Sequence, residues 1–186
     1  QAAIQSDFEL VKNYKTAIFD DGYSFVGGNL NGDITLVEFI DYKCGYCKKA
    51  HGEVEKLLGT DGNIRFIIKE FPILGEDSLK MSKFALAVKI AHGDKAYKVV
   101  HDILIKMKAE PSTKAFDRII NNLNLDKKLV QDAMESPEVK GIIADTRNLA
   151  EKLKISGTPT FVMKDELIRG YVPFDALIEL VANKRG

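Results

Sequence analysis

Apolar residues recur along the first part of the chain at the spacing of one face of a helix. The segment Phe8 to Phe19 shows this spacing and then reaches the turn-forming Asp20-Asp21-Gly22. We therefore expect an N-terminal amphipathic helix, and its length of about three turns favours packing on its own domain over packing on another subunit. Residues Tyr23 to Val26 alternate between apolar and polar and predict a short strand.

Two dense apolar segments then flank a helical pattern. Ile34 to Ile40 is short, rich in β-branched residues and bounded by turn residues, which predicts a buried central strand, and Asn63 to Lys69 has the same character. Between them, apolar residues recur at helical spacing from Cys47 until Gly59 ends the pattern. A strand-helix-strand unit of this kind places its two strands parallel in one sheet.

The rest of the chain is predicted to be helical except near its end. From about Asp77 to Leu153 all patterns are helical, with breaks near Gly93, Pro111, Asn124 and Ser136-Pro137. Strand signals return at 160–163 and 167–171, and a helix is predicted from Pro173 to Asn183. The order indicates an α/β core with an all-helical insertion, divided into an N-terminal helix (1–22), a first core part (23–75), the insertion (76–154) and a second core part (155–186).

The composition favours a soluble protein with a small-molecule or protein substrate. Lys plus Arg and Asp plus Glu each number 27, so no global field attracts nucleic acid or an anionic membrane. No apolar run approaches the roughly 18 to 20 residues of a membrane-spanning helix. The first residues, Gln1-Ala2-Ala3, are not a signal peptide. Because no initiating Met is present, we expect either a mature form after signal removal or a trimmed chain.

The two cysteines are the residues with the clearest chemical signal. Cys44 and Cys47 are separated by only two residues, so a bridge between them closes a very small loop and stabilises little. This leaves redox chemistry or metal binding. If Cys44 caps the following helix, the helix dipole and free backbone N–H groups favour its thiolate, with added positive charge from Lys43, Lys48 and Lys49. We therefore predict Cys44 as the attacking thiol and Cys47 as the resolving thiol.

A zinc site is the main structural alternative for the cysteine pair. Cys44, Cys47 and His51 are spaced to share a helical face, but a closed site needs a fourth ligand, and His92 and His101 lie in the helical insertion. Redox chemistry is therefore favoured, with no resident metal and no cofactor. Transient Cu(I) binding by the two soft thiolates of Cys44 and Cys47 stays open.

Two motifs together resemble a known family. The strand that leads into Cys44-Gly45-Tyr46-Cys47 and a helix, the late segment Ser156 to Val162 and the helical block between them are similar to the thioredoxin superfamily, and within it to the periplasmic DsbA-like proteins. The resemblance implies an α/β thioredoxin fold with a helical insertion. It also implies that Thr158 and Pro159 face the cysteines, with Pro159 cis, and bind extended substrate peptide.

The family resemblance also bears on a carboxylate in the central strand. Glu38 lies among Leu36, Val37, Phe39 and Ile40, where a buried charge is costly, so an outward-facing position is an equal alternative. The resemblance implies a buried acid beneath the cysteines that takes part in proton transfer. We therefore hypothesise that Glu38 takes part in proton transfer.

The direction of electron flow stays open at the level of sequence. Gly45-Tyr46 together with Thr158 resembles the disulfide isomerase DsbC, whereas the long insertion is DsbA-like; the suppressor-of-copper-sensitivity C proteins share this mixture. The resemblance implies a periplasmic oxidase or isomerase that acts on unfolded or wrongly bridged client proteins with a membrane redox partner. A homo-oligomer is expected if an arm precedes Gln1. A Cu(I) carrier is the alternative from another functional class.

Overall fold

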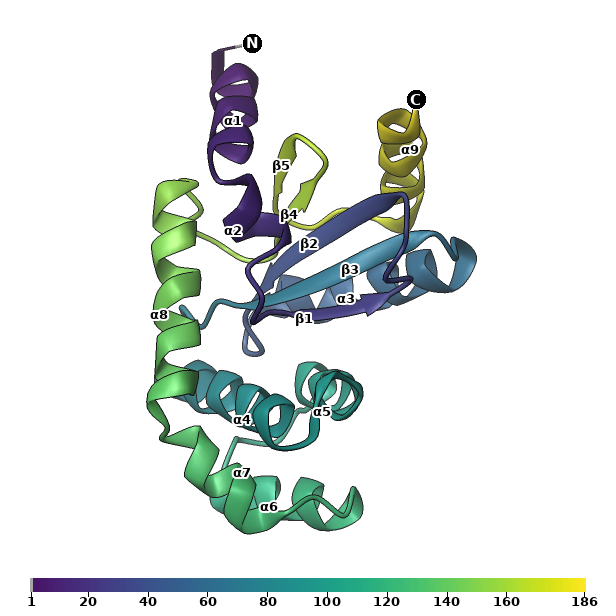
Figure 1. Cartoon of the computed structure of the whole chain (residues 1–186). Helices are drawn as coiled ribbons and strands as arrows, with labels where there is room; N and C mark the ends of the chain where they lie inside the picture. Colours follow the sequence, from purple (N-terminus) through teal and green to yellow (C-terminus); the bar gives the residue numbers. More distant parts are fainter. Residues whose placement is uncertain (1) are drawn as a thin grey trace.

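The computed structural model describes the backbone of residues 2–186 and the side chains of residues 6–186. Gln1, where the predicted N-terminal segment 1–22 begins, lies outside the described residues. A five-stranded sheet occupies one part of the molecule, and a group of helices forms the other (Figure 1). The helices are α1 Ala2–Asn13, α2 Lys15–Phe19, α3 Gly45–Thr60, α4 Glu76–His92, α5 Asp94–Lys106, α6 Thr113–Asn122, α7 Lys127–Met134, α8 Pro137–Lys152 and α9 Phe174–Arg185. The strands are β1 Phe25–Gly28, β2 Ile34–Ile40, β3 Ile64–Glu70, β4 Thr160–Met163 and β5 Glu166–Arg169.

The sheet has β2 at its centre. The strand order is β1-β3-β2-β4-β5, with β2 and β3 parallel and the other neighbouring pairs antiparallel. The parallel pair is joined by α3, as the strand-helix-strand pattern predicted. Because β2 has a neighbour on each side, its residues are buried almost throughout, which accounts for the dense apolar pattern of this segment.

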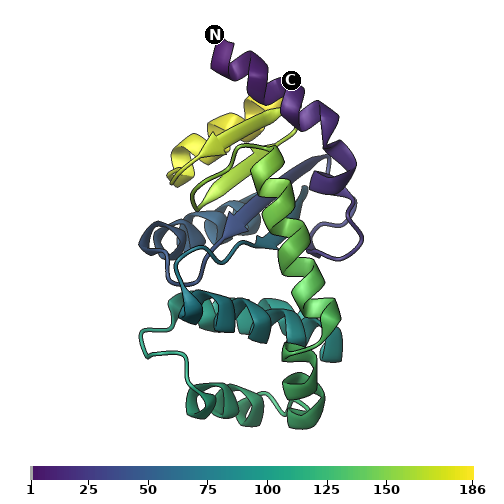
Figure 2. The ribbon, with the colours of Figure 1, turned by 90° about the vertical axis from the view of Figure 1, so that its left-hand side faces the viewer.

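Each face of the sheet contributes to a different hydrophobic core. Leu36 and Ile40 of β2 pack with residues of α3 and α9, in a core that continues into the helical part. Val37 and Phe39 face the other way and pack with Ile18 of α2 and with α8. Helix α8 runs beside both parts of the molecule and connects them (Figures 1 and 2).

The N-terminal helix packs on its own sheet, as predicted. Val11 and Ile18 are both buried in the second core. The prediction of one continuous helix over Phe8 to Phe19 is wrong, because the backbone leaves helical geometry at Tyr14, between α1 and α2. Both short helices turn their apolar side toward the same core, so the spacing of apolar residues gave no sign of the bend.

The helical part is divided by capping residues at the predicted breaks. The side chains of Ser112, Asp126 and Ser136 accept backbone N–H groups at the starts of α6, α7 and α8. Phe84 of α4 and Phe116 of α6 stack with ring centroids 4.3 Å apart. No helix within residues 2–186 combines the length and the apolar character needed to cross a membrane.

Candidate active site

The two cysteines lie where the central strand passes into α3. Cys44 is the N-cap of α3, and its Sγ accepts the backbone N–H of Cys47 at 3.3 Å. The backbone N–H of Cys44 donates to the carbonyl oxygen of Asp41 at 3.1 Å, which fixes the turn after β2. Both cysteines are free thiols. Reactive cysteines are commonly found at helix N-termini, where a sulfur faces the positive end of the helix dipole.

The two sulfurs have different surroundings. Cys44 is 8% exposed and Cys47 is 1% exposed. Burial raises the pKa of Cys47 well above its ordinary value, and the nearby charges of Glu38 and Cys44 act in the same direction. Cys44 is therefore the more accessible of the two sulfurs, and it lies at the N-terminal end of α3.

The late Thr158-Pro159 segment lies directly against the first cysteine. The Sγ of Cys44 donates to the carbonyl oxygen of Thr158 at 3.3 Å, although the two residues are 114 positions apart in the chain. The Thr158-Pro159 peptide bond is cis, as the resemblance implied. The carbonyl of Pro159 accepts the N–H of Gly170 at 2.9 Å, which ties the segment to the chain after β5.

The residues between the cysteines face solvent. Gly45 is exposed, and the Tyr46 side chain is 64% exposed. Ile73 and Leu74, in the loop after β3, are also exposed apolar residues. The surface that carries the dithiol therefore includes an aromatic ring available for contact.

Glu38 is buried, so the outward-facing alternative is wrong. It is 3% exposed and points to the same face of β2 as Leu36 and Ile40, which is the face that α3 covers. Burial raises its pKa to about 8, and the negative charge of Glu55 adds to the rise while Lys98 opposes it. The carboxyl group therefore changes its charge close to neutral pH.

The three lysines near the cysteines each contact a different part of the protein. Lys43 lies 3.7 Å from Glu110. Lys48 Nζ donates to the carbonyls of Ile105 and Met107 at 3.0 and 3.2 Å, which connects α3 to the end of α5. Lys49 Nζ lies 4.5 Å from the ring centre of Tyr171. Burial and the charge of Lys43 lower the pKa of Lys48, and negative charge at Asp41 or at either cysteine opposes this shift.

The His51 side chain lies next to His101 and does not form a metal site with the two cysteines. Its side chain lies with His101 and Asp102, and possible ligand atoms of the three are within 4.8 Å of one another. The group contains neither sulfur. Asp102 Oδ1 already accepts Lys98 Nζ at 2.7 Å, which places a positive charge where a metal ion would have to bind.

Sequence reasoning missed Asp41, which organises the turn before Cys44. Its Oδ2 accepts the backbone N–H groups of Ile73 and Leu74 at 2.8 and 3.0 Å. Its Oδ1 accepts the N–H of Lys43 at 2.8 Å and the hydroxyl of Ser78 at 2.7 Å. The sequence signal for Asp41 was a polar residue directly after an apolar strand. Its role could not be predicted from this signal, because its four hydrogen-bond donors come from three separate segments of the chain.

Replacing Asp41 with Asn is expected to lower the free energy of unfolding by about 2 kcal/mol, because an NH₂ group then faces backbone N–H groups. The matched variant Ser78→Ala removes one donor only and should cost about 1 kcal/mol. Urea unfolding followed by circular dichroism measures both. Equal stability of Asp41→Asn and the wild type would contradict this role for Asp41.

A second missed feature is a buried polar network between β3 and the helical part. Glu70 accepts the hydroxyls of Tyr42 and Ser82, each at 2.7 Å, and also that of Tyr97. Tyr42 has one hydroxyl proton, and it donates this proton to Glu70. In its contact with His101, 2.9 Å away, Tyr42 Oη is therefore the acceptor, and the Nδ1–H of His101 is the donor. Burial raises the pKa of Glu70 to about 7, although these hydrogen bonds oppose the rise. The network connects the cysteine turn to α4 and α5.

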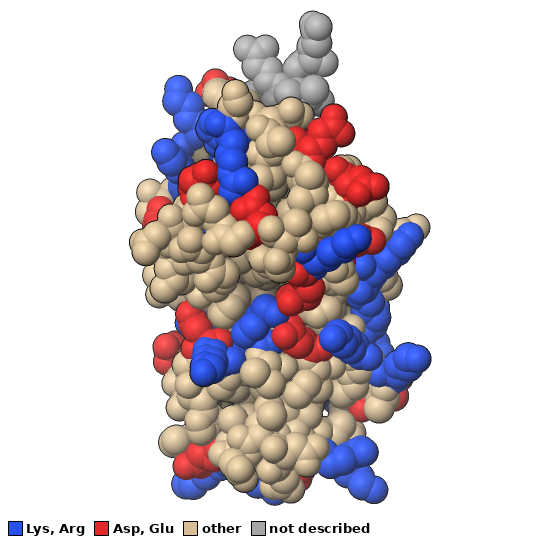
Figure 3. All heavy atoms as spheres, turned by 90° about the vertical axis from the view of Figure 1, so that its right-hand side faces the viewer, with Lys and Arg blue, Asp and Glu red and all other residues tan. Residues whose placement is uncertain are grey.

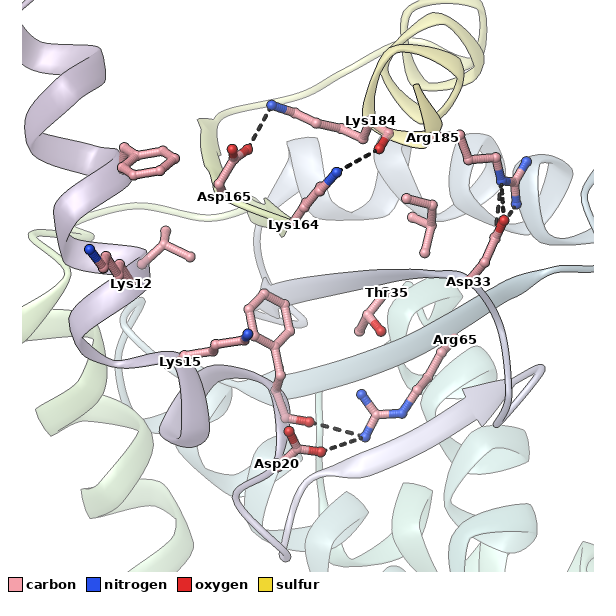
Figure 4. A pocket seen from close by; sticks show the side chains of 14 residues that line it. Lys12, Lys15, Asp20, Asp33, Thr35, Arg65, Lys164, Asp165, Lys184 and Arg185 are labelled. Carbon is pink, nitrogen blue, oxygen red and sulfur yellow. Dashed lines mark hydrogen bonds and ion pairs between the residues drawn. The ribbon is translucent and has the colours of Figure 1, made fainter.

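A cavity beside α1 and α2 lies away from the cysteines. It has a volume of about 620 Å³ and is lined by residues of α1, α2, β2, β3 and α9 (Figure 4). Its ion pairs include Arg65 with Asp20 and Lys184 with Asp165. Strand β2 contributes Ile34 and Thr35 from its first residues, whereas the cysteine turn follows its last residue. This cavity is therefore not part of the candidate active site.

Comparison with known proteins gives the family. The family model described as thioredoxin matches residues 20–183, which is most of the chain. The chain belongs to the thioredoxin family. The resemblance drawn from the two motifs is thus confirmed, as is the α/β thioredoxin fold with its helical insertion.

Solved structures of thioredoxin-like proteins are similar over nearly the whole chain. A thioredoxin-like oxidoreductase from Silicibacter pomeroyi is 38% identical, with 92% of this chain and 97% of that chain covered and a TM-score of 0.85. The thiol-disulfide exchange protein alpha-DsbA2 from Wolbachia pipientis is 30% identical over 99% and 98% of the two chains, with a TM-score of 0.90. The catalytic domain of Proteus mirabilis ScsC is 26% identical over 95% and 97%, with a TM-score of 0.85.

This thioredoxin-family chain also matches part of much longer curated proteins. Na⁺/H⁺ antiporter NhaA 3 from Salinispora tropica is 26% identical over 158 residues, which is 85% of this chain. NhaA 1 from Salinispora arenicola is 27% identical over 165 residues. The chain spans about a quarter of the length of these relatives, 24% and 25% respectively.

Proposed function

We propose that this chain catalyses thiol–disulfide exchange in protein substrates through Cys44 and Cys47. The observation that carries the proposal is the position of Cys44 Sγ, at the N-cap of α3 and 3.3 Å from the carbonyl oxygen of Thr158. A strand-like peptide that pairs with Thr158 would bring its own disulfide to this sulfur. The similarity to a thiol-disulfide exchange protein supports the same chemistry.

The proposed reaction has two steps. The thiolate of Cys44 attacks one sulfur of a client disulfide, which forms a mixed disulfide and releases the other client sulfur as a thiolate. Cys47 then loses its proton and attacks the sulfur of Cys44, which releases the second client thiol and leaves a Cys44–Cys47 disulfide. Two electrons pass from the dithiol to the client. The reverse sequence oxidises a reduced client.

In this proposal Glu38 accepts the proton of Cys47 during the second step. Cys47 is buried and its pKa is raised, so its thiolate does not form readily without a base. Glu38 is buried on the face of the sheet that α3 covers, and its charge contributes to the raised pKa of Cys47. A carboxyl group with a pKa of about 8 can take up a proton near neutral pH.

The cellular setting is proposed from the family resemblance. Disulfides persist in oxidising compartments, so a protein that acts on client disulfides fits the periplasm. There it would act on unfolded or wrongly bridged proteins and exchange electrons with a membrane redox partner. Thr158 and Pro159 would bind the client backbone, and Gly45 and Tyr46 would tune the dithiol.

Refolding of ribonuclease tests the proposed activity and its direction. The wild-type protein should accelerate the recovery of ribonuclease activity, and Cys44→Ser should not. Acceleration with reduced ribonuclease alone indicates an oxidase, whereas recovery of scrambled ribonuclease indicates an isomerase. No acceleration of either client by wild-type protein would contradict the proposal.

The Cu(I) carrier makes a different prediction for the same two sulfurs. A carrier binds Cu(I) tightly at a ratio of one per chain and does not turn over peptide disulfides. Titration with Cu(I) under a competing chelator, beside the ribonuclease assay, separates the two functions. We propose the enzyme, because a carrier has no use for Thr158-Pro159 beside Cys44.

A further inference from the structure

A second cavity, of about 580 Å³, lies between the start of α3 and the end of α5. We call it the lysine cleft. Its walls combine positive charge with apolar side chains and include Lys43, Lys48, Lys106, Lys108, Met81 and Met107. It is distinct from the larger cavity of Figure 4, which none of these residues lines.

The lysine cleft is next to the dithiol. Lys43 directly precedes Cys44, and Lys48 lies one helical turn after it on α3. Lys48 is close enough to the two cysteines for a thiolate at either of them to raise its pKa. Its Nζ also donates to the carbonyls of Ile105 and Met107, which holds the end of α5 against the cysteine helix. A client disulfide that reacts at Cys44 would therefore lie close to the cleft.

The charge of the lysine cleft is local and only partly compensated by acidic neighbours. The chain as a whole has no net charge, and side chains of both signs are mixed over the face drawn in Figure 3. Within the cleft, Lys43 lies 3.7 Å from the exposed Glu110. Among the described residues, Lys106 and Lys108 form no ion pair, and both are exposed. Two exposed cations are thus available to a ligand.

We propose that the lysine cleft binds acidic side chains close to the reacting cysteine of a client protein. This inference rests on the proposed function and adds a substrate class to it. Lys106 and Lys108 would contact client carboxylates, while the partly exposed Met107 accommodates an apolar side chain beside them. Cysteine segments rich in Asp or Glu then react faster than those rich in Lys.

Three disulfide-linked peptides test the proposal. The peptide has one cysteine, which is flanked by Glu-Glu, Gln-Gln or Lys-Lys. In each substrate, a disulfide joins a fluorophore-labelled copy of the peptide to a quencher-labelled copy. The full-length reduced protein cleaves the disulfide, and stopped-flow fluorescence gives the second-order rate constant. At about 20 mM salt we expect the Glu peptide to react about tenfold faster than the Lys peptide. At about 0.5 M salt the difference should fall below about twofold, since salt screens exposed charges.

A matched pair of variants separates the cleft from the overall charge. Lys106→Glu/Lys108→Glu should reverse the order of the Glu and Lys peptides and leave the rate for the Gln peptide within about twofold. Lys12→Glu/Lys15→Glu makes the same charge change on exposed residues of α1 and α2 and should preserve the wild-type order. Circular dichroism establishes that both variants are folded.

The outcomes distinguish this inference from the proposed function. Equal rates for the three peptides with wild-type protein would overturn the acidic preference while leaving disulfide exchange intact. An equal change of order in both double variants would also overturn it, because overall charge would then explain the preference. No reaction with any peptide would refute the proposed function itself.

Discussion

Replacing Cys44 with Ser is expected to reduce the turnover of protein disulfides by a factor on the order of 10³ or more. A serine hydroxyl at the N-cap of α3 keeps the helix capped but does not form the thiolate that attacks a disulfide. Cys47 does not replace it, because Cys47 is 1% exposed and burial raises its pKa. Reduction of insulin, followed by turbidity, measures the loss.

The matched variant Cys47→Ser should behave differently. Cys44 still attacks the client, but the mixed disulfide is no longer resolved, so a covalent complex accumulates and is seen on a non-reducing gel. Cys44→Ser should give no such complex. If the covalent complex accumulated with Cys44→Ser and not with Cys47→Ser, the proposed roles of the two sulfurs would be reversed.

Glu38→Gln is expected to stabilise the protein by roughly 3 kcal/mol at pH 7. The folded-state pKa of Glu38 is raised, from 4.5 to about 8, chiefly by burial. Below about pH 4.5 the carboxyl is protonated in both states, so its contribution to stability is fully present. As the pH rises toward 8, the unfolded state loses the proton first and the stability of the wild-type protein falls. The glutamine side chain of the variant does not titrate, so the stability of the variant does not fall in this way as the pH rises.

Urea unfolding of wild type and Glu38→Gln between pH 4 and pH 8 measures this difference. The two proteins should be similar in stability near pH 4 and diverge as the pH rises. An identical pH dependence of the two proteins would show that Glu38 does not carry the raised pKa.

The same variant should slow the second chemical step. Without a carboxylate to accept the proton of Cys47, release of the second client thiol should slow by about 10²-fold, while the first attack by Cys44 is unchanged. In stopped-flow experiments the wild-type second phase should depend on pH near 8, and the Glu38→Gln second phase should not. An unchanged pH dependence of thiol exchange would remove the proton-transfer role.

Much of the core was predictable because its signals are local. Ile34–Ile40 is a strand as predicted, since a central strand buried on both faces is apolar nearly throughout. The breaks in the helical insertion were predictable because capping residues such as Ser136 mark helix starts in the sequence. The bend at Tyr14 left no mark, since both helices on either side of it face one core.

The side-chain environment of the site was less predictable, because it depends on contacts between distant segments. The cysteine pair and Thr158-Pro159 are motifs, so they were found from the sequence. Whether Glu38 faced the core or solvent depended on which face of β2 the helix α3 covers. Asp41 and Glu70 each hold donors from elements far apart in the chain. Likewise, the end of α5 contacts Lys48, one helical turn after Cys44, only in the folded molecule.

Competitive alkylation shows which of the two sulfurs, Cys44 or Cys47, is the more reactive. The reduced wild-type protein is treated with less than one equivalent of iodoacetamide at pH 7, and peptide mass spectrometry then locates the label. We predict that Cys44 is labelled at least about 10²-fold faster than Cys47, because it is the N-cap of α3 whereas Cys47 is buried with a raised pKa. Labelling of Cys47 first, or of both cysteines at equal rates, would show that Cys44 is not the attacking thiol.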